Sequence, residues 1–575
     1  MRKLMLGNEA VARGLYEAGV KIASSYPGTP STEITEYTAL YDEIDCEWAP
    51  NEKVAAEVAA GASFAGARSF CAMKHVGLNV AADPFFTMSY IGVNGGMVLA
   101  VADDPGMHSS QNEQDSRHYA MAAKVPMLEP SDSAECKDYA KLAYELSEQF
   151  DTPAVLRLTT RVSHSRSLVE LGERQELALK PYEKNPQKNV MLPAMAKKKH
   201  VIVEQRTKDL TEYAETSGIN RVEMNSTKIG VITSGMSYQY AKEALGENAS
   251  YLKLGMVFPL PVRLIQDFAS QVDTLYVIEE LDDFIETHCR KIGLNPIGKE
   301  VFSLCGEFSQ NIVRKNILGG EPQSDALDMD IPMRPPVMCC GCPHRGLFYA
   351  LKKCKVYVSG DIGCYTLGAS APLSMMDTCV CMGASVSALH GYNKARGAQA
   401  EKKSVAVIGD STFMHSGVTG LIDIAYNATN SVVIILDNSI TGMTGHQQNP
   451  TTGYNIKGDP ALAVNLEDLC HSVGIDRVRV VDPYDLKQTL AVIKEELEAD
   501  APSVIISRRP CALLKYVKHK PALTVDKEKC IGCKACFGIG CPAISMKDGK
   551  AEIDHTQCVG CGICEGLCPT HAIEQ

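Results

Sequence analysis

Residues 404–438 read SVAVIGDSTFMHSGVTGLIDIAYNATNSVVIILDN, and this stretch decides the fold class of its part of the chain. SVAVIG and SVVIILD are apolar runs of strand length, with a helix-like segment between them. Two such runs joined by a helical crossover predict a β-α-β unit of an α/β domain with a parallel sheet. Because such crossovers are right-handed, the carboxyl ends of both strands meet at one edge of the sheet, where α/β folds bind ligands.

Polar residues follow both strand ends of this unit. The two runs are Gly409-Asp410-Ser411 and Asp437-Asn438. The Asp410 carboxylate, the Asn438 amide and the Ile440 carbonyl would supply three oxygens to an octahedral Mg²⁺, with positions left for diphosphate oxygens and water. Gly409 lets phosphate approach the backbone closely. The alternative is an ordinary βα turn in which Asp410 caps the helix.

Eight of the 22 cysteines lie in two short runs near the end of the chain. The runs are Cys530-x2-Cys533-x2-Cys536-x4-Cys541-Pro542 and Cys558-x2-Cys561-x2-Cys564-x3-Cys568-Pro569. This is nearly the bacterial pattern for two 4Fe-4S clusters, in which the fourth cysteine of each run ligates the other cluster. Two zinc sites are the alternative, but four cysteines per run, each ending in Cys-Pro, fit zinc poorly.

The pattern predicts how the eight cysteines divide between the two clusters. One cluster is held by Cys530, Cys533, Cys536 and Cys568. The other is held by Cys558, Cys561, Cys564 and Cys541. The gap of four residues before Cys541, where three is usual, makes its ligation the least secure of the eight.

Length, composition and charge limit the classes of protein to which this chain can belong. A chain of 575 residues is too long for one hydrophobic core, so three or four domains are expected. The net charge of -12 disfavours nucleic acid as a partner. The N-terminus lacks the pattern of a signal peptide, and no apolar run approaches the ~20 residues of a membrane helix. We expect a cytoplasmic protein, in which clustered cysteines bind metal rather than form disulfides.

The alternation of helical stretches and apolar strands suggests domain boundaries. Residues 1–180 predict a first α/β domain. Residues 181–227 are expected to form a linker, because the first part of this stretch is polar, basic and interrupted by prolines. A second α/β domain is expected at residues 228–320, closed by the passage GGEPQSDALDMDIPMRPPV. A third is expected at residues 337–515, and a small cysteine-rich domain at residues 521–575.

Two stretches resemble thiamine diphosphate enzymes. Their fingerprint is Gly-Asp-Gly followed by Asn-Asn, and here Ser411 stands for the last glycine and Asp437 for the first asparagine. The stretch NEKVAAEVAAGASFAGA, which contains Glu52, is similar to a helix of these enzymes whose glutamate hydrogen-bonds the aminopyrimidine ring. The resemblance makes Glu52 the expected catalytic residue. The alternative is a first-turn glutamate that only stabilises its helix.

The chain as a whole resembles the large (alpha) subunits of indolepyruvate:ferredoxin oxidoreductases, within the 2-oxoacid:ferredoxin oxidoreductases. Besides the cysteine tail and the magnesium motif, the resemblance rests on Tyr26-Pro-Gly-Thr-Pro-Ser-Thr32, Asn51-Glu52, Ser110-Gln-Asn-Glu-Gln-Asp-Ser-Arg117, Cys342-Pro-His-Arg345, Gly360-Asp-Ile-Gly-Cys364 and Thr444-Gly-His-Gln447. It implies an α/β, multidomain thiamine-diphosphate-binding fold of doubly wound parallel sheets. The domains implied are pyrimidine-binding, transketolase-C-like and diphosphate-binding, with a C-terminal α+β ferredoxin domain for two 4Fe-4S clusters. Thiamine diphosphate would lie between the first and third domains.

The resemblance also implies a reaction and partners. An aryl pyruvate, coenzyme A and oxidised ferredoxin would give aryl-acetyl-CoA, CO₂ and reduced ferredoxin. In the implied reaction the thiamine carbanion would add to the keto group, and the clusters would remove the electrons singly. A smaller beta subunit is expected as a partner, which makes the enzyme a hetero-oligomer.

Two further sets of residues carry roles that the resemblance suggests. Thr29 and Arg117 would contact the substrate, although a turn residue and a surface ion pair are the alternatives. Four cysteines lie where related pyruvate-oxidising enzymes keep a third cluster, but Cys340 replaces the usual proline there, and buried thiols are the alternative. These four are Cys339, Cys342, Cys364 and Cys511.

Three other functions compete with aryl pyruvate oxidation. The first alternative is an enzyme that oxidises another 2-oxo acid. The second is a non-oxidative thiamine-dependent decarboxylase with an added ferredoxin module. The third alternative is an electron-carrying subunit with no catalytic role. Product analysis and loss of turnover in Glu52→Gln with intact clusters separate these functions.

Overall fold

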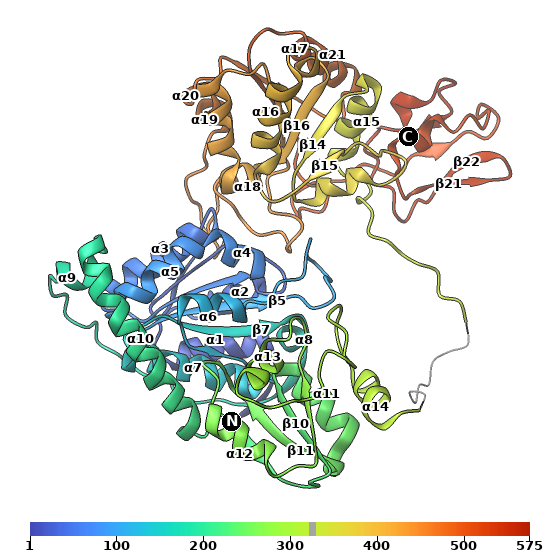
Figure 1. Cartoon of the computed structure of the whole chain (residues 1–575). Coiled ribbons are helices and arrows are strands. Elements are labelled where there is room, and N and C mark those ends of the chain that lie inside the picture. The colour runs from blue at the N-terminus through green and yellow to red at the C-terminus, as the bar shows by residue number, and fades with distance from the viewer. Residues whose placement is uncertain (321–328) are drawn as a thin grey trace. The chain divides into compact units, whose positions relative to one another are not determined.

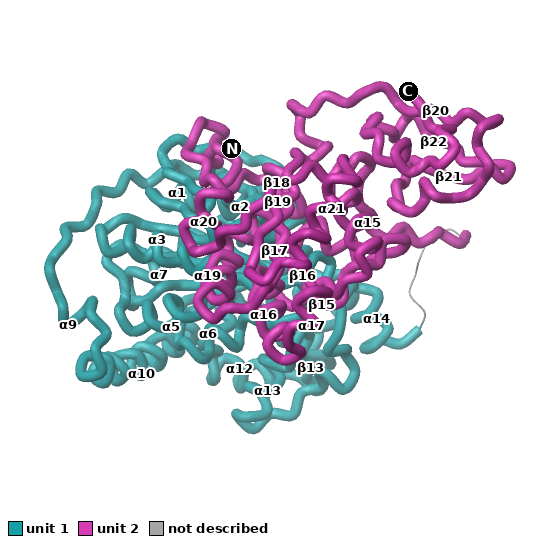
Figure 2. Tube along the Cα trace, turned by 90° about the horizontal axis from the view of Figure 1, so that it is seen from above, with its two compact units in different colours: residues 1–328 teal, residues 329–575 magenta. Residues whose placement is uncertain are grey.

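The computed structural model of the chain describes residues 1–320 and 329–575 (Figure 1). It divides into two compact units, residues 1–328 and residues 329–575 (Figure 2). The passage expected to close the second α/β domain falls partly on residues 321–328, which lie outside the described residues. In the described part of the chain, no helix has the length and apolar character needed to cross a membrane.

The first unit contains a seven-stranded sheet. In spatial order its strands are β12 (Met256–Phe258), β6 (Met127–Leu128), β7 (Ala154–Thr159), β5 (Met97–Asp103), β4 (Ser69–Lys74), β2 (Ile22–Ser25) and β3 (Asp45–Trp48). All neighbours pair in parallel except the edge strand β12, which runs antiparallel to β6. Strands β4, β5 and β7 are buried throughout, which explains their continuous apolar sequences.

Helices and a short ladder complete the first α/β part. Helix α1 (Gly7–Glu17) packs on α7 (Ser133–Gln149), and α3 (Glu52–Phe64) packs on α5 (Ala82–Ile91). The buried alanines of α3 share a core cluster with residues of β4 and β5. Their small side chains allow the helix to lie close to the sheet. Strands β1 (Arg2–Leu6) and β8 (Arg166–Glu170) pair antiparallel.

A second, four-stranded sheet follows in the same unit. Its strands are β13 (Thr274–Ile278), β10 (Ile229–Ser234), β11 (Ser250–Leu254) and β9 (Arg221–Glu223), with β9 antiparallel to β11. Strand β10 begins where the sequence predicted the second α/β domain. Strand β12 then leaves this part and joins the first sheet, and residues of both sheets share one hydrophobic core.

Residues 181–227 differ from the linker expected there, because they contain the 24-residue helix α10 (Pro193–Thr216). Pro193 does not break this helix, since it lies in the first turn, where a backbone N–H has no helical partner. The buried stripe of the helix is Val203, Arg206, Leu210 and Ala214. Arg206 donates to the Ser89 carbonyl at 2.7 Å. The domain boundary itself stays a prediction.

The second unit contains a six-stranded parallel sheet, as residues 404–438 predicted. Its order is β15 (Thr378–Cys379), β14 (Tyr357–Gly360), β16 (Ser404–Gly409), β17 (Val432–Asp437), β19 (Ser503–Arg508) and β18 (Arg477–Val481). The crossover between β16 and β17 contains α18 (Asp410–Thr412), a π turn and α19 (Val418–Asn427). Helices α15 (His344–Cys354), α16 (Ala384–Arg396) and α21 (Leu486–Leu497) pack on this sheet or on one another.

The cysteine-rich tail forms a small α+β segment of the second unit. Strand β21 (Ile544–Lys547) pairs antiparallel with β22 (Lys550–Ile553), and β20 (Thr524–Val525) with β23 (Ile573–Glu574). Its helical parts are the short 3₁₀ turns Ala535–Ile539 and Glu565–Leu567. The small core contains isoleucines together with the cysteines themselves.

Candidate functional site

Asp410 begins α18 at the carboxyl end of β16, next to β17 in the sheet. Its side chain is 2% exposed. Its Oδ1 atom accepts the backbone N–H of Ser411 at 2.7 Å, and Oδ2 accepts the Thr451 hydroxyl at 3.4 Å. Burial, and then the Asp437 carboxylate, raise the pKa of Asp410 to about 7. A bound cation would offset both effects.

The loop after β17 brings further oxygens to this edge of the sheet. Asn438 and Ile440 are both buried, and the Asn438 carbonyl accepts the N–H of Cys511 at 2.9 Å. The Thr441 hydroxyl donates to the Ser411 hydroxyl at 2.9 Å, which ties this loop to the turn after β16. The resulting set of carboxylate, amide and carbonyl oxygens fits Mg²⁺ and a diphosphate.

Tyr365 and Asp361 support the same edge from the segment that follows β14. A Cβ atom at Gly409 would lie 2.7 Å from Cε1 of Tyr365, so only glycine fits between strand and ring. The Asp361 carboxylate accepts the N–H groups of Gly383 and Ser385 at 2.9 Å each. It thereby fixes the turn that begins α16.

Glu52 occupies the first turn of α3 and is 4% exposed. The helix is capped by Asn51, whose side chain accepts the N–H of Val54 at 2.9 Å. The Glu52 carboxylate lies against Gly77 of α4 (His75–Val80), where an added Cβ would be 2.6 Å from Oε1. Burial lowers the pKa of Lys74 to about 8, opposed by the nearby charges of Asp104 and Glu52. Glu52 is therefore held in a tight, buried and charged environment of the first unit.

The two residues expected to contact substrate have different surroundings. Thr29 is half-buried and precedes a cis proline. Arg117 is 1% exposed, and its guanidinium pairs with the carboxylates of Asp115 and Glu279. It also donates to the Glu280 carbonyl at 3.2 Å. The substrate role of Arg117 stays a prediction, and its geometry favours an ion pair inside the domain.

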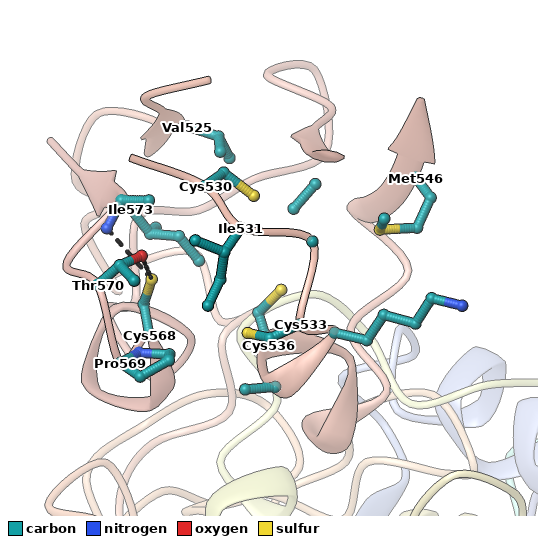
Figure 3. A pocket seen from close by; sticks show the side chains of 15 residues that line it. Val525, Cys530, Ile531, Cys533, Cys536, Met546, Cys568, Pro569, Thr570 and Ile573 are labelled. Carbon is teal, nitrogen blue, oxygen red and sulfur yellow. Dashed lines mark hydrogen bonds between the residues drawn. The ribbon is translucent and has the colours of Figure 1, made fainter. Parts of the chain in front are cut away.

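Four of the tail cysteines line one pocket of the small α+β segment. Figure 3 shows these side chains around the pocket, which is formed by Cys530, Cys533, Cys536 and Cys568 together with neighbouring apolar residues. The Cys568 sulfur accepts the N–H of Ala572 at 3.2 Å. Although burial opposes it, this bond and the Thr570 hydroxyl hold the pKa of Cys568 below its usual value. The arrangement favours the thiolate that iron requires.

The remaining tail cysteines line a second pocket. They are Cys541, Cys558, Cys561 and Cys564. The backbone N–H of Leu523 donates to the Cys558 sulfur at 3.5 Å. The fourth cysteine of each run lines the pocket of the other run, and the ligation of clusters by these two sets stays a prediction. Immediately before Cys541, Gly540 adopts a φ of +63°, a backbone conformation that glycine allows without strain.

The four cysteines suggested for a third cluster are neighbours in the second unit. Burial, and then the charges of Cys511 and Cys339, raise the pKa of Cys364 to about 11. Burial raises the pKa of Cys342 to about 12, and the charges of Cys364 and Cys339 add to the shift. Cys364 therefore interacts electrostatically with Cys339, Cys342 and Cys511, and a shared cluster at these four thiols stays a prediction.

Three family models match separate regions of the chain. A model described as "Pyruvate flavodoxin/ferredoxin oxidoreductase, thiamine diP-bdg" covers residues 13–230. The C-terminal TPP binding domain of thiamine pyrophosphate enzymes covers residues 361–507, and a 4Fe-4S binding domain covers residues 551–574.

Named relatives match nearly end to end. Indolepyruvate oxidoreductase subunit IorA of Archaeoglobus fulgidus is 42% identical, over 99% of this chain and 97% of that protein. The IorA subunits of Pyrococcus horikoshii and Methanothermobacter marburgensis are each 40% identical, over 100% of this chain and 96% and 97% of theirs. The chain belongs to the IorA family of indolepyruvate oxidoreductase subunits.

Membership in the IorA family confirms several predictions. The chain is a 2-oxoacid:ferredoxin oxidoreductase with thiamine diphosphate-binding domains and a C-terminal 4Fe-4S domain. The fold class is confirmed as well. A solved 2-oxoglutarate:ferredoxin oxidoreductase from Magnetococcus marinus is 17% identical, with a TM-score of 0.45 over 55% of this chain and 65% of that one, which is too distant to add to these conclusions.

Sequence reasoning missed one residue that organises the iron–sulfur side of this IorA-family chain. Arg345 is 3% exposed, and its Nε atom donates to the Cys339 carbonyl at 3.0 Å. Its guanidinium also donates to the carbonyls of Met338, Ile539 and Gly540. The Cys-Pro-His-Arg motif drew attention to Arg345, but contacts with a segment almost 200 residues later need the tertiary structure.

Proposed function

We propose that the chain is the large subunit of an enzyme that oxidises aryl pyruvates such as indolepyruvate and phenylpyruvate. The substrate and coenzyme A would become aryl-acetyl-CoA and CO₂, and two electrons would pass through the 4Fe-4S clusters to ferredoxin. The observation that carries this proposal is the similarity to the IorA proteins over the full chain, together with the two cysteine-lined pockets of the cysteine-rich tail.

Five residues would hold the cofactor. Thiamine diphosphate, when bound, supplies a nucleophilic carbon and an electron sink for decarboxylation. Asp410, Asn438 and the Ile440 carbonyl would hold Mg²⁺, while Gly409 and Ser411 would accommodate the diphosphate. Their support is the burial and common sheet edge described above.

Glu52 is the proposed catalytic residue of the first unit. It would hydrogen-bond the pyrimidine ring and move a proton at a ring nitrogen. Its burial and its close fit against Gly77 keep the carboxylate in one position, which general acid–base catalysis requires. Thr29 and Arg117 would contact the 2-oxo acid.

The cysteines would hold three clusters. Cys530, Cys533, Cys536 and Cys568 would ligate the first cluster, and Cys541, Cys558, Cys561 and Cys564 the second. A third would be held by Cys339, Cys342, Cys364 and Cys511, whose thiols influence one another electrostatically. Donor chemistry supports this set, since four thiolates are what a 4Fe-4S cluster takes.

The proposal also covers the partners, the location and the domains of the protein. The relatives are named as subunits, which supports a smaller partner subunit and a hetero-oligomer. Ferredoxin would be the electron acceptor and the cytoplasm the location. The proposed domains are residues 1–180, 228–320, 337–515 and 521–575, with residues 181–227 joining the first two.

The test is anaerobic turnover of the complex with its partner subunit and ferredoxin. Four substrates are compared, namely indolepyruvate, phenylpyruvate, pyruvate and 2-oxoglutarate. The proposal expects the two aryl substrates to be turned over fastest, with formation of acyl-CoA. Equal rates on all four would contradict the aryl assignment. Aldehyde formed without consumption of coenzyme A or ferredoxin would instead indicate a non-oxidative decarboxylase.

A further inference from the structure

The loop formed by residues 339–342 packs directly against the cysteine-rich tail within the second unit. Gly341 has a φ of +68°, and a Cβ atom there would lie 2.3 Å from Cγ2 of Val559. The Gly341 carbonyl accepts the hydroxyl of Tyr484 at 2.5 Å, and Arg509 stacks on the Tyr484 ring at 3.9 Å. The backbone of this loop is therefore fixed between β18–α21 and the second cysteine run.

Arg345 fixes the other side of the same loop. Its guanidinium binds the Cys339 carbonyl on one side and the Ile539 carbonyl on the other, each at 3.0 Å. Ile539 and Gly540 immediately precede Cys541. One buried arginine thus sets the distance between the loop and the fourth cysteine of the first run.

Cys340 is the residue that this arrangement directs into the second pocket. It lines the pocket together with Cys541, Cys558, Cys561 and Cys564, so five cysteines surround one cavity. Within this cavity its thiol interacts electrostatically with the thiols of Cys541 and Cys561. The cysteine pattern accounts for only four of the five, and a 4Fe-4S cluster takes four thiolates. Cys340 is therefore the surplus thiol of this pocket.

We propose that Cys340 is a positioning residue for the second cluster, acting by a hydrogen bond from its S–H to the sulfur of Cys541. This inference rests on the ligand set proposed above. A thiolate bound to iron carries no proton, so in this pair only Cys340 can donate. Hydrogen bonds to the ligand sulfurs withdraw negative charge and stabilise the reduced cluster, which raises its reduction potential.

The position of Cys340 in the chain gives this bond a consequence for electron flow. Its neighbours Cys339 and Cys342 belong to the set proposed for the third cluster, while Cys340 lines the pocket of the ligands proposed for the second. A single turn of backbone thus adjoins both metal sites. The donated bond would make the second cluster a better acceptor for electrons arriving from the thiamine side.

The test compares Cys340→Ala and Cys340→Ser with the unchanged complex, by iron analysis and by redox titration followed by electron paramagnetic resonance. The second cluster is identified as the signal lost in Cys564→Ser. Cys354→Ala, which removes another partly buried thiol of the same unit, is the matched control. In Cys340→Ala we expect unchanged iron content and a threefold to tenfold less favourable reduction of that cluster, tenfold being about 59 mV for one electron.

The serine variant keeps a donor, so it should shift the potential by less than half as much, and the Cys354→Ala control should not shift it. Unchanged potentials in Cys340→Ala with full iron would overturn the inference while leaving the ligand set intact. Loss of about four irons in both Cys340 variants would also overturn it, because Cys340 would then be a ligand. A wild-type complex without a signal that depends on Cys564 would instead refute the proposed ligand set.

Discussion

Arg345 donates a hydrogen bond from Nη1 to the carbonyl of Ile539 at 3.0 Å, so a residue of the α/β sheet domain holds the backbone of the iron–sulfur segment. The same guanidinium binds three further carbonyls on both sides of this contact. A buried cation that satisfies four carbonyls is costly to remove, because each carbonyl then lacks a partner.

Replacing this arginine should loosen the attachment of the iron–sulfur segment. We expect Arg345→Met to destabilise the second unit by about 3 kcal/mol. Chemical unfolding measures the loss, and limited proteolysis should cut faster between residues 515 and 521. Arg396→Met, at an exposed position at the end of α16, is the control. Equal unfolding midpoints for the two variants would contradict the structural role of Arg345.

Glu52→Gln should abolish proton movement while keeping the shape of the side chain. We expect turnover to fall by about 10²-fold or more, with iron content and thiamine diphosphate content unchanged. Glu57→Gln on the same helix changes a carboxylate that is 47% exposed and should leave turnover unaffected. Full activity in Glu52→Gln would refute the catalytic assignment.

Gly77→Ala tests the position of Glu52 without changing its chemistry. The added Cβ would lie 2.6 Å from Glu52 Oε1, so the carboxylate must move. Because a displaced catalytic group loses its alignment, turnover should fall by about 10²-fold while the unfolding midpoint changes little. Gly61→Ala on α3 meets open space, and it should keep full activity and gain slightly in stability. Similar activities of the two alanine variants would argue against a fixed Glu52.

Asp410→Ala should remove the metal anchor. We expect binding of thiamine diphosphate in the presence of Mg²⁺ to weaken by at least about 100-fold, measured by isothermal titration calorimetry. Chelation of Mg²⁺ should weaken binding to the wild type but have little further effect on the variant. Asp423→Ala, on the exposed side of α19, provides the control. Undiminished, Mg²⁺-dependent binding in Asp410→Ala would exclude Asp410 as a ligand.

The iron content of variants shows whether the protein binds three clusters or two. If the third set binds a cluster, Cys364→Ser should contain about four fewer iron atoms than the wild type. Cys354→Ser should lose none, because its thiol lies outside the three sets. An identical iron content in both variants would favour buried thiols at the third set.

The parts of the fold that were predictable have local signals. Buried parallel strands such as β16 and β17 are continuous apolar runs, and the cysteine spacing reflects the loop that surrounds a cluster. Helix α10 was missed because its buried stripe contains Arg206, whose charge masks the helical period. That arginine is buried because its guanidinium donates to carbonyls of neighbouring segments.

The candidate site was predictable to a similar extent. Strand ends identified Asp410 and Asn438, since parallel strands bring their carboxyl ends to one edge. The contacts of Arg345, Tyr365 and Cys340 were not predictable, because each joins segments that are distant in sequence or depends on a glycine leaving room for a neighbour. Such relationships have no periodicity or spacing to reveal them.

Strand β12 affects how this protein can be divided or recombined. It comes from the part of the chain that carries the four-stranded sheet, yet it forms the edge of the seven-stranded sheet beside β6. A fragment that ends before residue 256 would leave backbone N–H and C=O groups of β6 without their β12 partners. Such an exposed edge can pair with strands of other molecules. Chimeras between relatives should therefore exchange residues 1–320 as one block.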